Sequence, residues 1–148
     1  MTIYFYSTRD NYGCFSNFSR HGFELDGFYW LTSEHYFQAY KFVETDPDWF
    51  GKIRDVKSPK EAAKMGRDRA HPLRQDWNEV KDGIMQQAVL KKFQTHADIR
   101  EILLATGEEL LVENAPNDYY WGCGKDGSGQ NKLGLILMAV RDILRSEG

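Results

Sequence analysis

The chain has 148 residues and a formal net charge of −3. This length suits one domain with one sizeable core, and the negative charge argues against nucleic-acid binding by overall charge. Aromatic residues make up 14% of the chain. That share fits either a core rich in rings or a pocket that stacks on flat ligands.

The composition also argues against metal, disulfide and membrane chemistry. The two cysteines, Cys14 and Cys123, form no C-x-x-C pair, the four histidines are scattered, and H-E-x-x-H is absent. We therefore expect no metal and no cofactor, and reduced thiols as in a cytoplasmic protein. The start "MTIYFYSTRDN" lacks the features of a signal peptide, and the longest apolar run, 133–140, is too short to span a bilayer. We expect no membrane partner.

The first third of the chain predicts strands and then a helix. "IYFY" (3–6) is rich in β-formers and predicts a strand. "GFELDGFYW" (22–30) predicts a hairpin that turns at Asp26-Gly27. Thr32 or Ser33 can then cap a helix that starts at Glu34.

Helix signals dominate the rest of the chain. Further helix starts are expected at Asp46-Pro47, "SPKE" (58–61), "DWNE" (76–79, running to about Gln94) and Thr95, the last helix ending at Gly107. "ELLVE" (109–113) predicts a short strand, and 114–130 a long loop. Asn131 can cap the final helix. The order predicts a single α+β domain over residues 1–148, mainly helical with a small β-sheet or hairpin.

"WGCGKDGSGQNKLG" (121–134) resembles two nucleotide-binding motifs, and we reject both. Its G-x-G-x-x-G is followed by only 21 residues after Gly127, too few for a dinucleotide fold. A Walker A motif fails because Gln130 stands where lysine is required. A glycine loop before a helix can still offer backbone amides to a phosphate, with Lys132 adding charge. The alternative is a flexible surface loop.

A basic stretch covers residues 52–74. It holds eight Lys and Arg against three Asp and Glu, or +5, inside a chain of net −3. This is either a solvated helix face or a collar that attracts phosphorylated ligands. "MGRDR" (65–69) suits the second reading, because Gly66 permits close approach and Arg67 or Arg69 offers a fork to phosphate.

"TSEHYFQAYKF" (32–42) places two charges in an aromatic helix. Glu34 and Lys41 are seven residues apart, hence on nearly the same face, with Gln38 between them. The helix N-terminus favours an ionised Glu34, which could stabilise a developing cation or take a proton from water. Alternatively, Glu34 is an ordinary first-turn residue and Lys41 reaches water. His35 is expected to be a packed or hydrogen-bonded histidine.

Several single residues carry a functional and a structural interpretation. Asn17 and Phe18 could contact a ligand or form a turn. Trp77 could stack on a base or anchor the core. Glu113, Asp118 and Trp121 flank the glycine loop and could form a sugar site or a solvated loop.

Together, "FYSTRDNYGCFSNF", "DGFYWLTSEHYFQAYKF", "AAKMGRDR" and "NDYYWGCGKDGSGQNKLGLILMAVR" resemble the NADAR family of YbiA-like N-glycosidases, from about residue 3 to residue 145. The resemblance implies a mainly helical α+β domain without metal. It also implies hydrolysis of an N-glycosidic bond to the ribose of a phosphorylated or ADP-ribosyl compound. Leu31 and Tyr40 differ from the residues common at these positions in relatives. Neither change removes a charged site residue, so the difference bears on the choice of substrate and not on activity.

The resemblance also assigns site residues. It places the catalytic glutamate at Glu34, the lysine at Lys41 and an aspartate at Asp118. Lys41 either holds a phosphate or hydroxyl or forms a Schiff base with the opened ribose. The residues expected to bind substrate are Asn17, Phe18, Gly66, Arg67, Trp77, Glu113, Trp121, Gly122, Asn131 and Lys132.

Three functions follow as alternatives. The first is an N-glycosidase acting on early riboflavin intermediates, the ribosylamino-pyrimidine phosphates, with release of ribose 5-phosphate. The second is a hydrolase that removes ADP-ribose from guanine in DNA or nucleosides. The third is a non-catalytic ADP-ribose or nucleotide reader, which has no need of Glu34. The sequence leaves the oligomeric state open.

Overall fold

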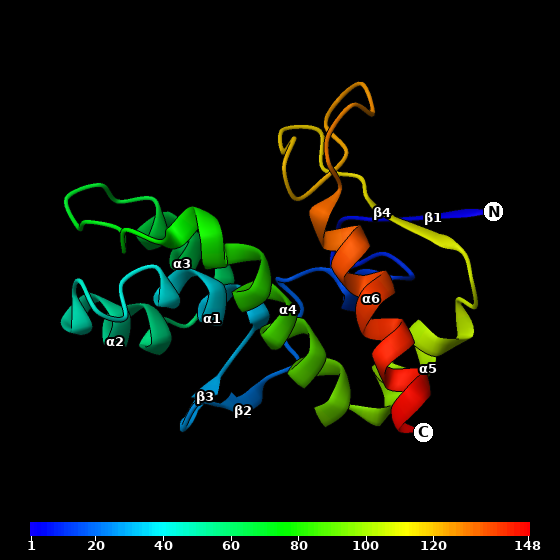
Figure 1. The fold of residues 1–148 in the computed structure, drawn as a ribbon, viewed down its shortest axis with the longest axis horizontal. Coiled ribbons are helices and arrows are strands. Elements are labelled where there is room, and N and C mark those ends of the chain that lie inside the picture. Colours follow the sequence, from blue (N-terminus) through cyan, green and yellow to red (C-terminus); the bar gives the residue numbers. More distant parts are fainter. The chain divides into compact units, whose positions relative to one another are not determined.

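The computed structural model describes all 148 residues, Met1–Gly148, whose contacts gather into two compact units. We call Met1–Ser19 with Phe93–Gly148 the terminal unit, and Arg20–Lys92 the central unit. The elements are six α-helices and four strands with a short 3-10 helix, Gly13–Phe15 (Figure 1). The predicted α+β class is confirmed. No helix is long and apolar enough to cross a membrane.

The central unit begins with the predicted hairpin. β2 (Phe23–Leu25) and β3 (Phe28–Trp30) pair antiparallel, with Phe23 opposite Trp30. Asp26 and Gly27 form the turn with φ of 56° and 85°. Two successive positive φ values are those of a type I′ turn, which matches the twist of the strands.

Three short helices follow, α1 (Ser33–Tyr40), α2 (Pro47–Asp55) and α3 (Pro59–Gly66), and α1 packs on the other two. Each has a side-chain cap at the predicted place, because a short polar side chain there accepts an otherwise unpaired amide. The capping residues are Thr32, Asp46 and Ser58. α4 (Trp77–Thr95) follows, and its residues from Phe93 onward belong to the terminal unit.

Rings fill the space between the hairpin, α1 and α2. Trp30 is fully buried, and its ring centroid lies 5.1 Å from that of Tyr36 and 5.7 Å from that of Phe50, both edge to face. Tyr40 packs on the same three rings. Much of the aromatic content therefore serves the core.

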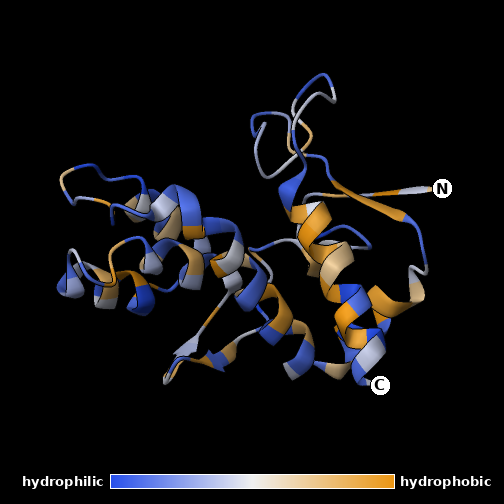
Figure 2. Cartoon of the chain, viewed as in Figure 1, coloured by the Kyte–Doolittle hydropathy of each residue, from blue (hydrophilic) through white to orange (hydrophobic).

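The terminal unit joins the two ends of the chain. β1 (Thr2–Phe5) pairs parallel with β4 (Leu110–Glu113), and α6 (Lys132–Glu147) packs on β4. The apolar residues of β4 and α6 stand out in Figure 2. α5 (Ala97–Ala105) follows His96, so the predicted start at Thr95 is wrong, because Thr95 still belongs to α4.

Asn131 stands at the expected N-cap position of α6 but does not cap it. Its φ is 52°, and its side chain makes no capping hydrogen bond. Instead Oδ1 accepts from the amide of Glu113 at 2.9 Å, and Nδ2 donates to the carbonyl of Leu111 at 2.9 Å. Asn131 therefore ties the start of α6 to β4.

Candidate functional site

Glu34 and Lys41, which their spacing places on nearly the same helix face, interact electrostatically. Gln38, one turn from Glu34, donates from Nε2 to Glu34 Oε2 at 2.6 Å. The Glu34 carboxylate and the Lys41 ammonium attract each other through space. This face of α1 thus presents an acid, an amide and an amine side by side.

Lys41 is buried, with 7% of its surface exposed. Its Nζ lies 5.6 Å from the ring centroid of Phe37 and 5.8 Å from that of Trp77, and donates a long hydrogen bond of 3.4 Å to the carbonyl of Gly66. Burial lowers the pKa of Lys41 to about 8, against the raising effect of Glu34. Loss of hydration disfavours the charged amine, so a larger share of it is neutral near pH 7.

Three further cations act on Lys41 and lower its pKa further: Arg69, Arg67 and Lys81. Arg69 Nη1 also donates to the carbonyl of Gly66, at 3.2 Å. The sequence interpretation missed Lys81, although it follows Trp77 by one turn on α4 and therefore lies near it on the helix surface. A cluster of positive charge of this kind suits a phosphate.

The basic stretch does not form one collar. Arg54 lies over the ring of Phe28, with its guanidinium 4.3 Å from the centroid. Arg74 pairs with Asp76 at 2.6 Å. These two cations have partners of their own, so the +5 of this stretch overstates the charge available near Lys41.

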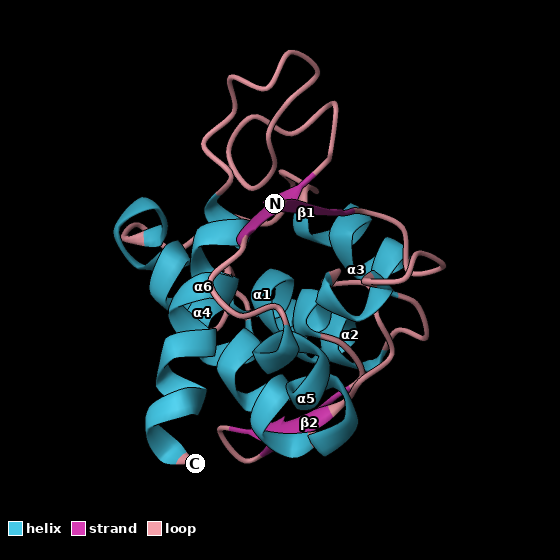
Figure 3. Cartoon of the chain, turned by 90° about the vertical axis from the view of Figure 1, so that its right-hand side faces the viewer, coloured by secondary structure: helices cyan, strands magenta, loops and turns pink.

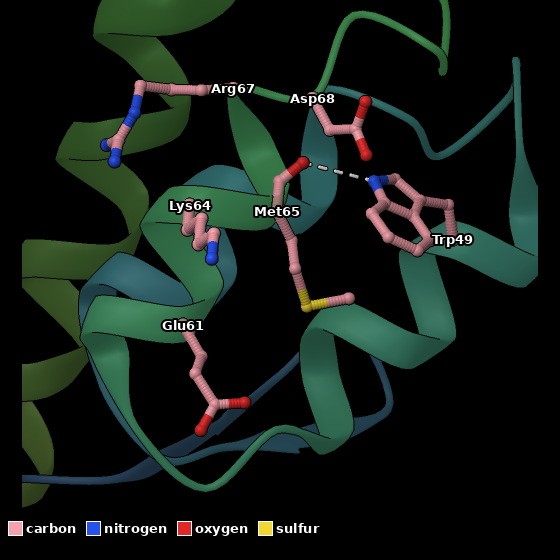
Figure 4. Close-up of a pocket in the computed structure, with 6 residues that line it drawn as sticks. All are labelled: Trp49, Glu61, Lys64, Met65, Arg67 and Asp68. Carbon is pink, nitrogen blue, oxygen red and sulfur yellow. Dashed lines mark hydrogen bonds between the residues drawn. The ribbon is translucent and has the colours of Figure 1, made fainter.

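A cavity of about 670 Å³ lies between α2 and α3 (Figure 4). Figure 4 shows the Met65 thioether inside it and Arg67 pointing away from Trp49. Trp49 Nε1 donates to the carbonyl of Met65 at 3.1 Å. Glu34 and Lys41 do not line this cavity; among the cations acting on Lys41, Arg67 alone does. The lining residues are Trp49, Glu61, Lys64, Met65, Arg67 and Asp68.

Trp77 belongs to the wall beside Lys41. It is 8% exposed, and its ring centroid lies 5.0 Å from that of Phe37. Burial to this degree favours the core interpretation of Trp77 over stacking on a base. Gly66 is buried too, and its close approach is to Gln38.

The remaining predicted site residues belong to the terminal unit. Half of them, Asp118, Trp121, Gly122 and Asn131, lie in the segment between β4 and α6, drawn as loop in Figure 3. Asp118 Oδ1 accepts from the amides of Tyr120 at 3.0 Å and Trp121 at 2.8 Å. The Asp118 carboxylate thus holds a turn of this loop.

The predicted phosphate cradle of backbone amides is wrong at the start of α6. The amides of residues 130, 131, 132 and 133 all donate, to the carbonyls of residues 119, 122, 120 and 121 respectively. An amide that already donates to a carbonyl is not available to a phosphate. At Gly122, a Cβ would lie 2.8 Å from Ala115 Cβ, so glycine there permits packing of the loop on itself.

The other predicted contacts differ in exposure. Phe18 is 38% exposed, whereas Asn17 is buried. Lys132 Nζ lies 5.7 Å from the ring centroid of Tyr120. Glu113 engages Asn131 through its backbone amide. Phe18 is therefore the most accessible member of this group, Glu113 and Lys132 being half-buried.

His35 has a structural role, as expected. Its Nε2 lies 2.9 Å from the carbonyl of Val56, which can only accept, so that nitrogen carries the proton. Nδ1, 2.7 Å from the Thr32 hydroxyl, then accepts from it. Burial lowers the pKa of His35, which keeps the ring neutral. The structure groups no three His, Cys, Asp or Glu residues in a way that could hold a metal.

Comparison with known proteins places this chain among enzymes that act on N-glycosyl compounds. The sequence model of the NADAR domain matches residues 4–145, and the chain belongs to the NADAR family. It is an α+β N-glycosidase of that family. The expected resemblance is confirmed.

Individual relatives agree over nearly the whole chain. The chain is 55% identical to the N-glycosidase Npun_R5314 of Nostoc punctiforme, covering 99% of this chain and 94% of that protein. It is 51% identical to the N-glycosidase YbiA of Escherichia coli, covering 98% and 89%. The NMR structure of E. coli YbiA superposes with a TM-score of 0.91, covering 99% of this chain and 86% of that one.

A more distant relative has a different name. The chain is 42% identical to the chloroplastic riboflavin biosynthesis protein PYRR of Zea mays, covering 94% of this chain and 24% of that protein. The likeness therefore concerns one part of a longer protein.

Proposed function

We propose that the chain hydrolyses the N-glycosidic bond of a ribosylamino-pyrimidine phosphate, an early riboflavin intermediate, and releases ribose 5-phosphate. The names of its relatives support both the bond type and the pathway. The observation that carries the proposal is the buried Lys41 amine beside Glu34, with Arg67, Arg69 and Lys81 acting on it.

Glu34 stabilises the positive charge that the reaction creates. Breaking a ribosyl carbon–nitrogen bond builds positive charge on the sugar, and a fixed carboxylate stabilises it. Once the base has left, the same carboxylate can take a proton from the attacking water. Gln38 holds the carboxylate in place through its 2.6 Å hydrogen bond.

Lys41 supplies a nucleophile. With a pKa of about 8, roughly a tenth of its amine is neutral at pH 7, far more than for an ordinary lysine. The neutral amine adds to C1 of the ring-opened ribosylamine, which is an imine. A proton passes from Nζ to the pyrimidine amine, the bond from C1 to that amine breaks, and a lysine Schiff base remains. Water adds to this Schiff base, the C1–Nζ bond breaks, and the ribose 5-phosphate aldehyde leaves with Lys41 restored.

The cations near Lys41 supply the phosphate-binding role. Arg67, Arg69 and Lys81 hold the 5-phosphate, in place of the loop amides that are already occupied. The family resemblance also assigns a catalytic role to Asp118, which either orients a ribose hydroxyl or assists proton transfer. Trp77 and Phe37 wall the amine from water, which keeps its pKa low.

A product assay on two substrates tests this function. We expect release of ribose 5-phosphate from the ribosylamino-pyrimidine phosphate. Glu34→Gln keeps the shape but removes the charge, and we expect kcat to fall by about 100-fold or more. If only ADP-ribosylated guanosine is hydrolysed, the chain is an ADP-ribosyl hydrolase instead. If neither substrate gives a product, both enzyme functions are refuted.

A further inference from the structure

We propose that Gln38 and Gly66 form a positioning pair that fixes both Glu34 and Lys41 at the site. This inference rests on the proposed function of those two side chains. Gln38 acts through the hydrogen bond from its amide to Glu34, and Gly66 acts through the space that it leaves and through its carbonyl.

The Gln38 amide can face Glu34 in one orientation only. An ionised carboxylate only accepts hydrogen bonds, so the NH₂ end of the amide must point toward it. The oxygen end, Oε1, is then directed elsewhere, and it is buried without a hydrogen-bond partner. Buried polar atoms are normally paired, so this exception needs an explanation. The hydrogen bond to Glu34 explains it, because that bond fixes the direction of Oε1.

Gly66 makes room for that oxygen. A Cβ at position 66 would lie 1.8 Å from Gln38 Oε1 and 2.6 Å from its Cδ. Gly66 belongs to α3 and its φ is not positive, so the backbone itself does not require glycine. Glycine is needed at this position for Gln38 rather than for a turn.

The carbonyl of Gly66 holds the amine side of the site. It accepts from Lys41 Nζ at 3.4 Å and from Arg69 Nη1 at 3.2 Å. One residue thus sets the place of Gln38, and through it of Glu34, while its carbonyl sets the place of Lys41. A side chain at position 66 disturbs both groups together.

The first test follows the Glu34 carboxyl by ¹³C NMR titration of the ligand-free protein. In Gln38→Met the donor to the charged carboxylate is lost, so the pKa of Glu34 should rise, by roughly one unit. The charged neighbours of the pair, Lys41, Arg67, Arg69 and Lys81, are unchanged in this variant. The acid limb of kcat/KM for the ribosylamino-pyrimidine phosphate should move to higher pH with it. An unmoved carboxyl titration would overturn the positioning role.

The stability of Gln38→Met shows whether Gln38 positions Glu34 or only packs in the core. Gln38→Met removes the unpartnered oxygen and keeps the side-chain length, so the urea midpoint should not fall while kcat falls about tenfold. A loss of stability that accounts for the loss of activity, without a shift of the pH limb, would show a structural role only.

A double-mutant cycle tests whether Gly66 acts through Gln38. Gly66→Ala alone should reduce kcat about tenfold and raise the pKa of Glu34. A Gln38→Ala background removes the contacts of the new methyl at 1.8 and 2.6 Å and leaves that with the Gln38 Cβ at 3.1 Å, so the added effect of Gly66→Ala should largely vanish. Gly51→Ala is the matched control, because Gly51 lies in helix α2 with nothing within 4 Å of a Cβ. Full additivity of the two changes would contradict the pair.

The carboxyl titration also keeps the two proposals apart. If the wild-type chain releases no ribose 5-phosphate, the proposed function fails, while the titration of Glu34 still decides whether the pair exists. If the wild-type chain is active but neither variant moves the Glu34 pKa, the pair fails alone.

Discussion

Lys41 and Arg141 are both buried cations, but their surroundings differ. Arg141 Nη1 donates to the Thr106 hydroxyl and to the carbonyl of Glu109, each at 2.9 Å. Lys41 has a 3.4 Å bond to a carbonyl and lies between two rings. Arg141 thus fastens α6 to the start of β4, whereas Lys41 remains an incompletely solvated amine. Such an amine costs stability and gains reactivity.

The buried amine predicts a pH-dependent stability. Below pH 8, Lys41 is protonated in both the folded and the unfolded chain, so its destabilising effect is constant. Between pH 8 and 10.5 the folded chain has released a proton that the unfolded chain still holds, so the free energy of unfolding rises with pH. Lys41→Met should therefore be more stable than wild type at pH 7, by up to about 3 kcal/mol, and equally stable near pH 10.5.

Urea unfolding of both proteins at pH 7 and pH 10 measures this difference, and comparing the two proteins cancels the other titrating groups. An equal difference at both pH values would show that Lys41 is not desolvated in solution.

At the scale of elements, Asp118 in the loop between β4 and α6 has a structural role as a hydrogen-bond acceptor and a proposed catalytic role as a charge. A pair of variants can separate the two. Asp118→Asn keeps the oxygen that accepts from the amides of Tyr120 and Trp121 but loses the charge. We expect its stability to change by less than about 0.5 kcal/mol and its kcat to fall at least about tenfold. Asp118→Ala loses the acceptor as well and should cost about 1–2 kcal/mol of stability.

Thermal unfolding and turnover of the two Asp118 variants give the comparison. Full turnover in the Asn variant would show that Asp118 only shapes the loop.

The helices also show which local features a sequence predicts. The caps of α1, α2 and α3 depend on residues within one turn of each other, and Thr32, Asp46 and Ser58 are where the pattern predicts them. Asn131 fits the same pattern at α6, yet its side chain bonds to β4. A partner about twenty residues away competes with the local cap, and no local pattern records it.

For the whole molecule, contacts between distant segments are the part that the sequence leaves open. β1 and β4 pair across more than a hundred residues, and the amides of 130–133 are occupied by the carbonyls of 119–122. The first pairing has no local signal, and the second overturned the expected amide cradle. Helix periodicity did predict the shared face of Glu34 and Lys41, because seven residues make nearly two turns. It could not predict that Arg69 and Lys81 would join them.

The NADAR match spans residues of both units. In the proposed mechanism, the central unit supplies three chemical roles. An acid, a nucleophilic amine and a cationic anchor come from α1, the segment after α3, and α4. The central claim of the proposed mechanism is a covalent bond between the Lys41 amine and the sugar.

Borohydride trapping with the ribosylamino-pyrimidine phosphate tests that claim most directly. We expect peptide mapping by mass spectrometry to find a reduced ribose 5-phosphate adduct on Lys41, with a trapping rate that rises with pH to a midpoint of about 8 and no adduct in Lys41→Arg. Turnover without any adduct, or an adduct on another lysine, would contradict the account.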